Sequence, residues 1–362
     1  MSVAVPAGTP PAPPSTTRGT GPDLLRRGVL RGGWGRLLGL VVAAGLLAAV
    51  TLSSVLVGNY SVSVGDVVSA ISAPPATDLD RIVRHIRIPR TIAGVLAGTA
   101  LGVAGVVMQS ITRNPLAGPG ILGINSGAAL AVVVAMTAFG VSTAGGFVWF
   151  AFAGAAIAAA FVYTLGSLGL GGATPVKLAL AGAAFTAFVG AITSMLTLLD
   201  ASTLDDFRFW VVGSLTRADG TSLTAVAPFI GAGLLAAVVT SRTLNVLALG
   251  EDMARNLGTR LWSTRLIAAL AVVALAGSAT AIAGPIAFIG LVVPHIARLI
   301  TGPDYRWVMA WTAVLAPALL LTADILGRIL VQPQQLQVGI ITGLAGAPFF
   351  LYLVRNRKVA GL

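Results

Sequence analysis

The chain has 362 residues, of which 56% are hydrophobic and only 10% are charged, and its mean hydropathy is +0.92. This composition excludes a soluble globular protein, because soluble chains of this length carry far more charge. The net charge of +11 does not indicate nucleic-acid binding, because the basic residues stand at the ends of apolar runs. The absence of cysteine excludes disulfides and thiolate metal sites, and two histidines far apart in the sequence do not favour a histidine-based metal site.

The start of the chain predicts a tail followed by a membrane span. Residues 1–30 are rich in Pro, Thr, Gly and Ser and show no sustained apolar periodicity, which indicates a disordered tail. The apolar run 37–57 follows several arginines. Its length of about twenty residues and its lack of a small-residue cleavage site favour a spanning helix over a cleaved signal peptide. We therefore expect two parts, the tail at residues 1–30 and a transmembrane domain at residues 31–362.

Nine further apolar segments of roughly the length that a bilayer requires follow along the chain. The expected spans are 90–110, 120–139, 145–166, 176–199, 222–241, 261–283, 286–299, 307–330 and 336–354. The span 286–299 is short and contains Pro294, so we expect it to be tilted or broken. The sequence thus predicts an all-α polytopic membrane protein with about ten transmembrane helices.

The distribution of basic residues predicts the orientation. Ten spans place both termini on the same side of the membrane. With the termini inside, 16 of the 23 Lys and Arg residues lie in inner segments and 7 in outer segments. Because basic residues are enriched in cytoplasmic segments, this bias favours a cytoplasmic location for both termini.

Two segments in opposite halves of the chain are similar to each other. Leu96–Gly105 reads LAGTALGVAG and Leu275–Gly284 reads LAGSATAIAG, with six of ten positions identical. Pro115 and Pro294 follow at the same offset of 179. The two spans run in opposite directions, which favours an inverted repeat of spans two to five and seven to ten, as in many transporters. The alternative is chance similarity between two helices rich in Ala and Gly.

The segment 247–258, LALGEDMARNLG, predicts a short helix on the cytoplasmic side. Gly250 opens this helix, and Glu251, the only glutamate of the chain, lies in its first turn, where the helix dipole favours an acidic side chain. Glu251 and Arg255 are spaced as an i,i+4 pair, and Gly258 is a natural C-terminal stop.

An apolar stripe on this helix suggests its role. Leu249, Met253 and Leu257 recur every four residues. A water-exposed helix with such a stripe usually docks on a partner, and we interpret it as the contact for a soluble motor protein. The alternative is an ordinary interfacial loop helix.

Two cytoplasmic turns contain residues that exclude a continuous helix. They read NPLAGPG at 114–120 and GGATP at 171–175. The functional interpretation of the first is a constriction lined by Asn114 and Leu116 at the inner mouth of a pathway. The alternative is that both are simple turns.

The outer segment 78–90, DLDRIVRHIRIPR, concentrates positive charge where the orientation rule disfavours it. Its arginines are three residues apart and would cluster on one side of a helix. We expect Pro89 to break this helix. The arginines are Arg81, Arg84, Arg87 and Arg90. These arginines either pair with Asp78, Asp80 and lipid headgroups or bind the carboxylates of an acidic partner.

Two further ionisable positions lie within expected spans. Asp324 and Arg328 are four residues apart on one helix face, either as a self-neutralising pair or as functional groups. His295 is interpreted as a packing residue rather than as part of a proton relay.

Four long segments resemble the iron–siderophore and vitamin B12 permease family of ABC importers. They appear in the family's order and read RIPRTIAGVLAGTALGVAGVVMQSITRNPLAGPGILGINSGAAL, ALGEDMARNLG, GPIAFIGLVVPHIARL and VGIITGLAGAPFFLYLVR. The resemblance implies a ten-helix permease in the cytoplasmic membrane that works as a dimer of identical or sister chains. It also implies two ATPase subunits inside, which carry ATP and Mg, and a solute-binding protein outside; this chain itself would bind no cofactor.

The resemblance further implies roles for individual residues. The loop that contacts the ATPase corresponds to Leu249, Gly250, Glu251, Met253, Ala254, Arg255, Leu257 and Gly258. The cytoplasmic gate corresponds to Asn114, Pro115, Leu116 and, in the second turn, Thr174. The arginines that meet acidic residues on the two lobes of the binding protein correspond to Arg87, Arg90 and Arg328.

The predicted function is therefore that of a permease subunit for a ferric siderophore, with cobalamin or haem as alternative cargo. The chain has no phosphate-binding GxxxxGK[ST] motif, so the energy must come from a partner subunit and the chain is not itself an enzyme. A secondary transporter driven by an ion gradient would need intramembrane carboxylates, and only Asp324 and Asp200 qualify, both near span ends. An intramembrane enzyme is disfavoured because no plausible catalytic group has a partner in the sequence.

Overall fold

The structure, a computed structural model, describes residues 28–30, 32–58, 60, 62–72, 77–141, 143–169 and 174–355. Within these ranges the chain is helical and contains no β-strand. Nearly all of the predicted tail, residues 1–27, lies outside the described residues. The N–H groups of Val29 and Leu30 donate to the carbonyl oxygens of Leu299 and Ile300, so these two residues before the first span already contact the end of α13.

Ten helices correspond to the ten expected spans. They are α2 (Gly32–Leu56), α5 (Ile88–Thr112), α6 (Ile124–Phe139), α7 (Ala144–Ser167), α8 (Pro175–Leu199), α10 (Gly220–Ala248), α12 (Leu261–Ala283), α13 (Ile289–Thr301), α14 (Tyr305–Ile329) and α15 (Val338–Arg355). Eight of these helices are long and apolar enough to cross a membrane, and α6 and α13 are shorter apolar helices. The prediction of an all-α polytopic membrane protein is confirmed.

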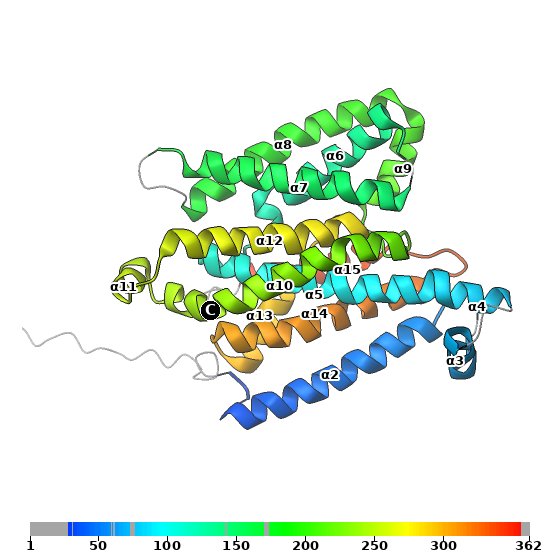
Figure 1. The fold of residues 1–362 in the computed structure, drawn as a ribbon, viewed down its shortest axis with the longest axis horizontal. Helices are drawn as coiled ribbons and strands as arrows, with labels where there is room; N and C mark the ends of the chain where they lie inside the picture. Colours follow the sequence, from blue (N-terminus) through cyan, green and yellow to red (C-terminus); the bar gives the residue numbers. More distant parts are fainter. Residues whose placement is uncertain are drawn as a thin grey trace, which may run out of the picture.

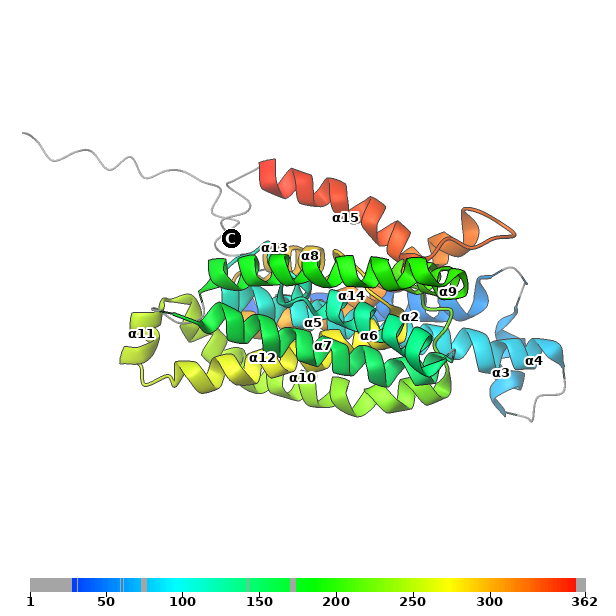
Figure 2. The same cartoon turned by 90° about the horizontal axis from the view of Figure 1, so that it is seen from above.

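Short helices connect the spans at both ends of the bundle. They are α3 (Val64–Ser72), α4 (Asp78–Ile82), the π-helix η1 (Val83–Arg87), the 3-10 helix η2 (Pro119–Leu122), α9 (Ala201–Val211) and α11 (Glu251–Asn256). Figure 1 shows α11 beyond one end of the long helices and α3 and α4 beyond the other, and Figure 2 shows the same separation after rotation. The connections therefore define two opposite ends, which we call the α11 end and the α4 end.

Helix α5 is the centre of the bundle and packs against α10, α12, α13 and α14. Small residues allow this close packing. A Cβ atom on Gly105 would lie 1.8 Å from the carbonyl oxygen of Gly290 in α13, and one on Gly98 would lie 2.5 Å from the Cα atom of Pro317 in α14. Helices α5 and α12, which carry the two similar segments, run in opposite directions, as the inverted-repeat interpretation requires (Figure 1).

This packing predicts that Gly105→Ala destabilises the permease. The added methyl group has no space against Gly290, so α5 and α13 must separate, at a cost of about 1–3 kcal/mol. Gly190→Ala in α8 is the matched control, because a Cβ atom there would meet no atom within 4 Å. Thermal unfolding of the two purified variants should show a clearly lower Tm for Gly105→Ala only; equal melting temperatures would contradict the packing argument.

The expectation that Pro89 breaks the helix before the membrane is wrong. The helix continues from Asp78 to Thr112, because the preceding segment Val83–Arg87 is a π-helix. The N–H group of Ile88 donates to the carbonyl oxygen of Val83, five residues earlier. The wider turn provides space for a proline ring, which would clash with the carbonyl group four residues earlier in a regular α-helix.

Candidate functional site

Helix α11 has the form that the sequence predicts. Gly250 adopts a φ of +117° before the helix, Leu257 caps its C-terminus, and Gly258 follows with a φ of +76°. The structure pairs Arg255 with Asp252, at 3.9 Å between Nη1 and Oδ1, whereas the side chain of Glu251 lies outside the described part.

The apolar stripe of this helix faces outward. Leu249, Met253 and Leu257 are 68%, 52% and 60% exposed, whereas Ala254 is fully buried against the bundle. The helix projects from the end of the molecule, between α10 and α12 (Figure 1). Three large apolar side chains are thus available to a partner at the α11 end.

The first of the two expected gate turns begins where α5 ends. Arg113 leaves the helix in the left-handed conformation, with a φ of 48°, and its N–H group donates to the carbonyl oxygen of Gln109. The side-chain oxygen of Asn114 accepts a hydrogen bond from the N–H group of Leu116 at 2.9 Å, which closes the turn locally. Asn114 is exposed, and Pro115 and Leu116 are half-buried.

The second expected turn falls largely outside the described residues. Thr174 is described, and its hydroxyl oxygen accepts the N–H group of Lys177 and so caps α8. Helix α8 packs against η2, which begins at Pro119 within the first turn. The two expected gate segments therefore lead into neighbouring elements.

At the α4 end, the structure brings together the three arginines expected to dock a binding protein. Asp324 lies between two of them: it accepts from Arg90 Nη2 at 2.7 Å and from Arg328 Nε at 3.0 Å. Arg328 Nη1 also donates to the carbonyl oxygens of Ser54 and Val57, at 2.6 and 3.0 Å. We call Arg90, Asp324 and Arg328 the buried ionic cluster.

Arg87 lies beside this cluster and, like Arg328, binds backbone carbonyl groups. Its guanidinium group donates to the carbonyl oxygens of Val55, Leu56 and Tyr60 at 2.6–2.8 Å. The last carbonyl groups of a helix have no partners within the helix, so Arg87 and Arg328 satisfy the C-terminus of α2.

The burial of these arginines determines which groups they bind in this structure. Arg328 is 2% exposed and Asp324 is fully buried. In this arrangement the guanidinium groups bind the chain itself and join α2, α5 and α14. Their contact with an acidic partner stays a prediction. The sequence spacing showed the pair Asp324–Arg328, but it contained no signal for the link from Arg90 across 234 residues.

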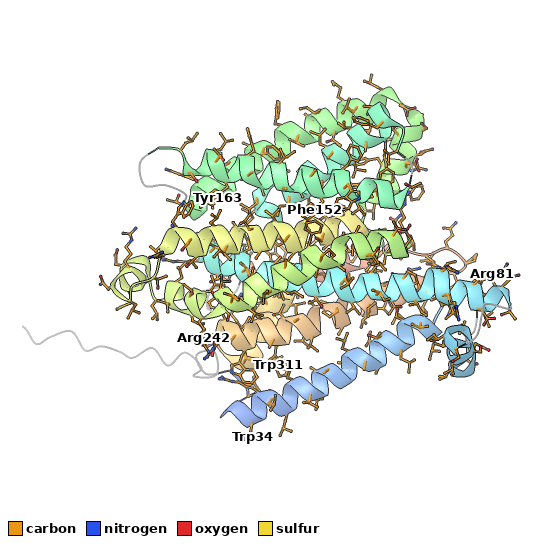
Figure 3. All side chains as sticks on the ribbon, viewed as in Figure 1. Trp34, Arg81, Phe152, Tyr163, Arg242 and Trp311 are labelled. Carbon is orange, nitrogen blue, oxygen red and sulfur yellow. The ribbon has the colours of Figure 1, made fainter. Side chains whose placement is uncertain are left out.

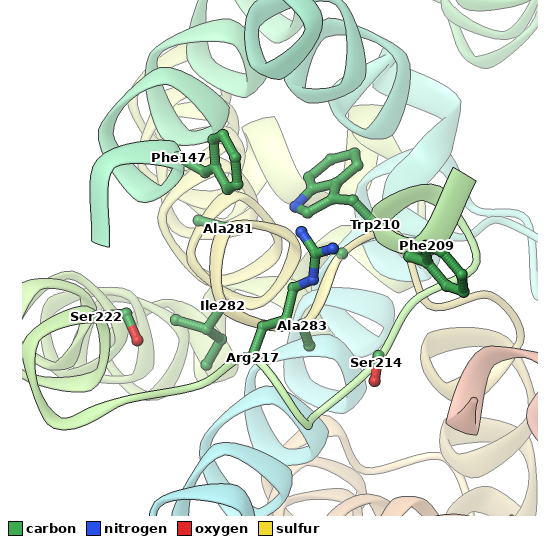
Figure 4. A pocket seen from close by; sticks show the side chains of 10 residues that line it. Phe147, Phe209, Trp210, Ser214, Arg217, Ser222, Ala281, Ile282 and Ala283 are labelled. Atoms are coloured by element: carbon green, nitrogen blue, oxygen red, sulfur yellow. The ribbon is translucent and has the colours of Figure 1, made fainter. Parts of the chain in front are cut away.

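Two hollows at the α4 end lie next to each other. Figure 4 shows the smaller one, where the guanidinium group of Arg217 lies among Trp210, Phe147 and Ala283. Its cavity volume of about 10 Å³ is too small for a ligand. The larger hollow, about 240 Å³, is polar; its lining residues include Arg90, Ser214, Thr216, Arg217, Gln335 and Gln337.

A hydrogen-bonded connection at the α11 end was not predicted from the sequence. Asn245 in α10 donates to Asp304 Oδ1 at 2.8 Å and accepts from the N–H group of Tyr305 at 2.9 Å. Asp304 also binds Arg306 at 2.9 Å. This connection ties the helix that leads into α11 to the start of α14. Burial opposes ionisation of Asp304, but the hydrogen bonds from Arg306 and Asn245 outweigh it and lower the pKa of Asp304 to about 2.

The lowered pKa of Asp304 predicts a pH-dependent contribution to stability. A carboxylate whose pKa is lower in the folded state than its usual 3.8 stabilises the fold above that value and loses this contribution as the pH falls towards about 2. The Tm of the parent should therefore exceed that of Asp304→Asn near neutral pH, and the difference should shrink between about pH 4 and pH 2. A Tm difference that stays constant over this pH range would contradict the lowered pKa of Asp304. Asp252→Asn, which removes an exposed carboxylate, serves as the control.

Among the residues that the structure describes, no group of three His, Asp or Glu side chains could hold a metal ion. The remaining features are ten apolar helices, an exposed short helix with an apolar stripe at one end and an ionic cluster at the other. Together they define a multi-pass membrane protein of the transport-permease class.

The chain belongs to the FecCD transport family, whose sequence profile matches residues 46–356. It is 46% identical over 317 residues to the ferric enterobactin transport system permease protein FepD of Escherichia coli (strain K12), covering 87% of this chain and 94% of FepD. It is 40% identical to the probable siderophore transport system permease protein YfiZ of Bacillus subtilis (strain 168), covering 88% of this chain and 95% of YfiZ.

The fold comparison agrees with the sequence comparison. The chain superposes, with a TM-score of 0.76 and 27% identity, on a solved inward-facing structure of an ABC transporter described as of metal-chelate type. The match covers 88% of this chain and 98% of that one. The predicted family is confirmed, and with it the interpretation of the chain as the transport permease subunit of an ABC importer.

Proposed function

We propose that this permease carries a ferric siderophore across the cytoplasmic membrane, driven by two ATPase subunits that dock on α11. The observation that carries the proposal is the exposed stripe Leu249, Met253 and Leu257 on a chain whose sequence contains no ATP-binding loop. Burial of such a stripe in a groove contributes binding energy of about 1.5–3 kcal/mol per large apolar side chain. The excess of basic residues in the same segments supports a cytoplasmic location for this end and for both termini.

The cargo is proposed from the names of the relatives. FepD and YfiZ are named for ferric enterobactin and siderophore transport, and other matches are named for iron(3+)-hydroxamate and Fe(3+)-citrate. Relatives named for hemin and cobalamin also match, at 38% and 40% identity, so haem and cobalamin remain the alternative cargo.

The proposed cargo is tested by competition. Cells that depend on this permease and its partners should accumulate radioactive iron from a ferric siderophore, and an excess of unlabelled siderophore should abolish the signal. An equal excess of haem or cobalamin should leave it unchanged. Accumulation of labelled cobalamin or haem without siderophore uptake would overturn the cargo and leave the permease class intact.

For the gate, we propose that Asn114, Pro115, Leu116 and Thr174 narrow the inner mouth between this chain and a second permease chain, identical or a sister. The position of the first turn and of Thr174 beside helix ends at the α11 end supports this role.

For the outer end, we propose that a solute-binding protein docks over the polar hollow beside Arg90. Arg87 and Arg328 support this surface by holding α2. Arg217 is one third exposed and pairs only loosely with the exposed Asp206, at 3.8 Å, so its guanidinium group can also contact an acidic side chain of the partner. Arg217→Glu should therefore weaken binding of the solute-binding protein about tenfold at low salt. Arg208→Glu, at the same end but outside the hollow, is the control, and equal affinity for the two variants would contradict the docking position.

A further inference from the structure

The short helix α3 at the α4 end has an apolar surface that no part of the described chain covers. Val64, Val68 and Ile71 are 55%, 57% and 62% exposed. Their spacing of four and three residues places them on one face of the helix. Asp66 and Ser69 lie on the opposite face, so the exposed surface of α3 is itself amphipathic.

The remaining side of α3 is fixed to the bundle. Val67 and Ala70 are buried and belong to a small apolar cluster with Val55 of α2 and Val83 of η1. The Nε atom of Arg84 in η1 donates to the carbonyl oxygen of Ala70, in the last turn of α3. Helix α3 therefore has a fixed position relative to the ends of α2 and η1.

The position of α3 along the bundle corresponds to a membrane surface. Helix α2 has 25 residues, so it is about 37 Å long, slightly more than the roughly 30 Å of a hydrocarbon core. Trp34 in its first turn and Tyr60 just beyond its end are both exposed, and exposed Trp and Tyr side chains are enriched in the two headgroup layers. Figure 3 shows Trp34 at the end of α2 that is far from α3. Helix α3 begins four residues after Tyr60 and thus lies at headgroup level.

The direction of α3 and its continuity with α2 favour a lipid surface as the partner. Helix α3 lies across the long helices in both views, and so along the plane of the membrane that these helices span (Figures 1 and 2). It packs on α2, which exposes apolar side chains along its length, among them Leu38, Val42 and Leu46. Amphipathic helices in this orientation bury their apolar face at the boundary between headgroups and acyl chains, and their polar face stays hydrated.

A protein partner accounts for this surface less well. The core of a protein interface is enriched in aromatic residues, Met and Arg, whereas the surface of α3 contains only the aliphatic side chains of Val and Ile. The polar hollow proposed for the solute-binding protein is lined in part by Gln335 and Gln337, directly before α15. Figure 2 shows α15 and α3 on opposite sides of the molecule.

We propose that α3 is a membrane anchor whose face of Val64, Val68 and Ile71 lies among the acyl chains, just below the headgroups of the leaflet at the α4 end. Asp66 and Ser69 face the water. Because α3 is joined to η1 and to the end of α2, this contact fixes the depth at which the buried ionic cluster lies in the membrane. The proposal depends on the membrane spans and not on the cargo, the ATPase or the solute-binding protein.

The test uses the full-length chain, which contains no cysteine, so a single spin label can be placed on either face of α3. Ile71→Cys carries the label on the apolar face, and Ser69→Cys, an exposed position on the opposite face, is the matched control. Both proteins are reconstituted in vesicles of equal amounts of phosphatidylcholine and phosphatidylglycerol. EPR power saturation compares collisions of the label with oxygen, which concentrates among acyl chains, and with a water-soluble nickel chelate. The ratio of oxygen to nickel collisions should be several-fold higher for Ile71→Cys.

A second pair of variants tests the cause of this difference. Val68→Asp adds a charge to the apolar face, and a charged side chain is strongly disfavoured among acyl chains. In the Ile71→Cys background this change should lower the ratio several-fold. Ser69→Asp adds the same charge to the polar face and should leave the ratio unchanged. Equal Tm values for the two aspartate variants show that both retain the fold, and Val64→Asp replaces Val68→Asp if the latter unfolds.

Three results would overturn the proposal. Equal and strong contact of both labels with the nickel chelate would place the apolar face of α3 in water. Protection of the Ile71→Cys label from both reagents in the permease alone would indicate contact with a second permease chain. Protection that appears only after addition of the solute-binding protein would identify the face as a docking surface for that protein.

Discussion

A Met253→Asp variant of the assembled transporter is expected to hydrolyse ATP but to import almost no cargo. Met253 is the middle residue of the exposed stripe on α11, between Leu249 and Leu257. Burial of a methionine side chain contributes about 1.5–3 kcal/mol, and an aspartate in its place would be desolvated without a partner, which costs at least a similar amount. A loss of this size weakens the contact by roughly a hundredfold or more.

The spans should be unaffected, because Met253 lies outside the spanning helices. Asn256→Asp is the matched control: it adds the same charge to the same short helix, at a position outside the stripe. Transport and ATP hydrolysis are measured in parallel in proteoliposomes. Coupled transport at the parent's rate in Met253→Asp would show that α11 is an ordinary loop helix.

The second large effect is expected at the buried ionic cluster. Asp324→Asn leaves Arg90 and Arg328 buried without their shared carboxylate, and breaking a buried pair in this way costs about 3–5 kcal/mol. The loss falls on the junction of α2, α5 and α14, so unfolding should begin at the α4 end. Denaturant unfolding of the purified permease measures it, with Asp205→Asn, which loses only an exposed pair with Arg208, as the control.

A second variant separates charge from packing at this cluster. Asp324→Leu combined with Arg328→Met removes both charges of one pair and replaces them with apolar side chains of similar size. It should recover part of the stability lost in Asp324→Asn, because it leaves one buried arginine in place of two. A stability of Asp324→Asn equal to that of the control would show that the cluster does not hold the helices together.

The sequence was sufficient for the spans and for α11, because both depend on local patterns. Apolar runs of sufficient length predict spanning helices directly, and Gly250 and Gly258 mark a short helix by their backbone requirements. The residues of the exposed stripe could be named because helical spacing alone places Leu249, Met253 and Leu257 together.

The binding partners of the arginines at the α4 end could not be predicted, because they do not depend on local patterns. Arg87 and Arg328 bind carbonyl groups at or just beyond the end of α2, and Arg90 binds Asp324 across 234 residues. Of these contacts, only the pair Asp324–Arg328 is local in the sequence. The π-helix before Pro89 was also missed, because a proline in sequence predicts an interruption and gives no sign of how the preceding turn will adapt.

The central claim is that this permease imports its cargo with energy from ATP, through an ATPase docked on α11. The most direct measurement is uptake of iron-labelled siderophore into proteoliposomes that contain the permease, its partner subunits and ATP. Uptake should require ATP, stop with vanadate and persist when a protonophore removes the ion gradient. Uptake that continues without ATP and stops with the protonophore would contradict the claim and identify a secondary transporter.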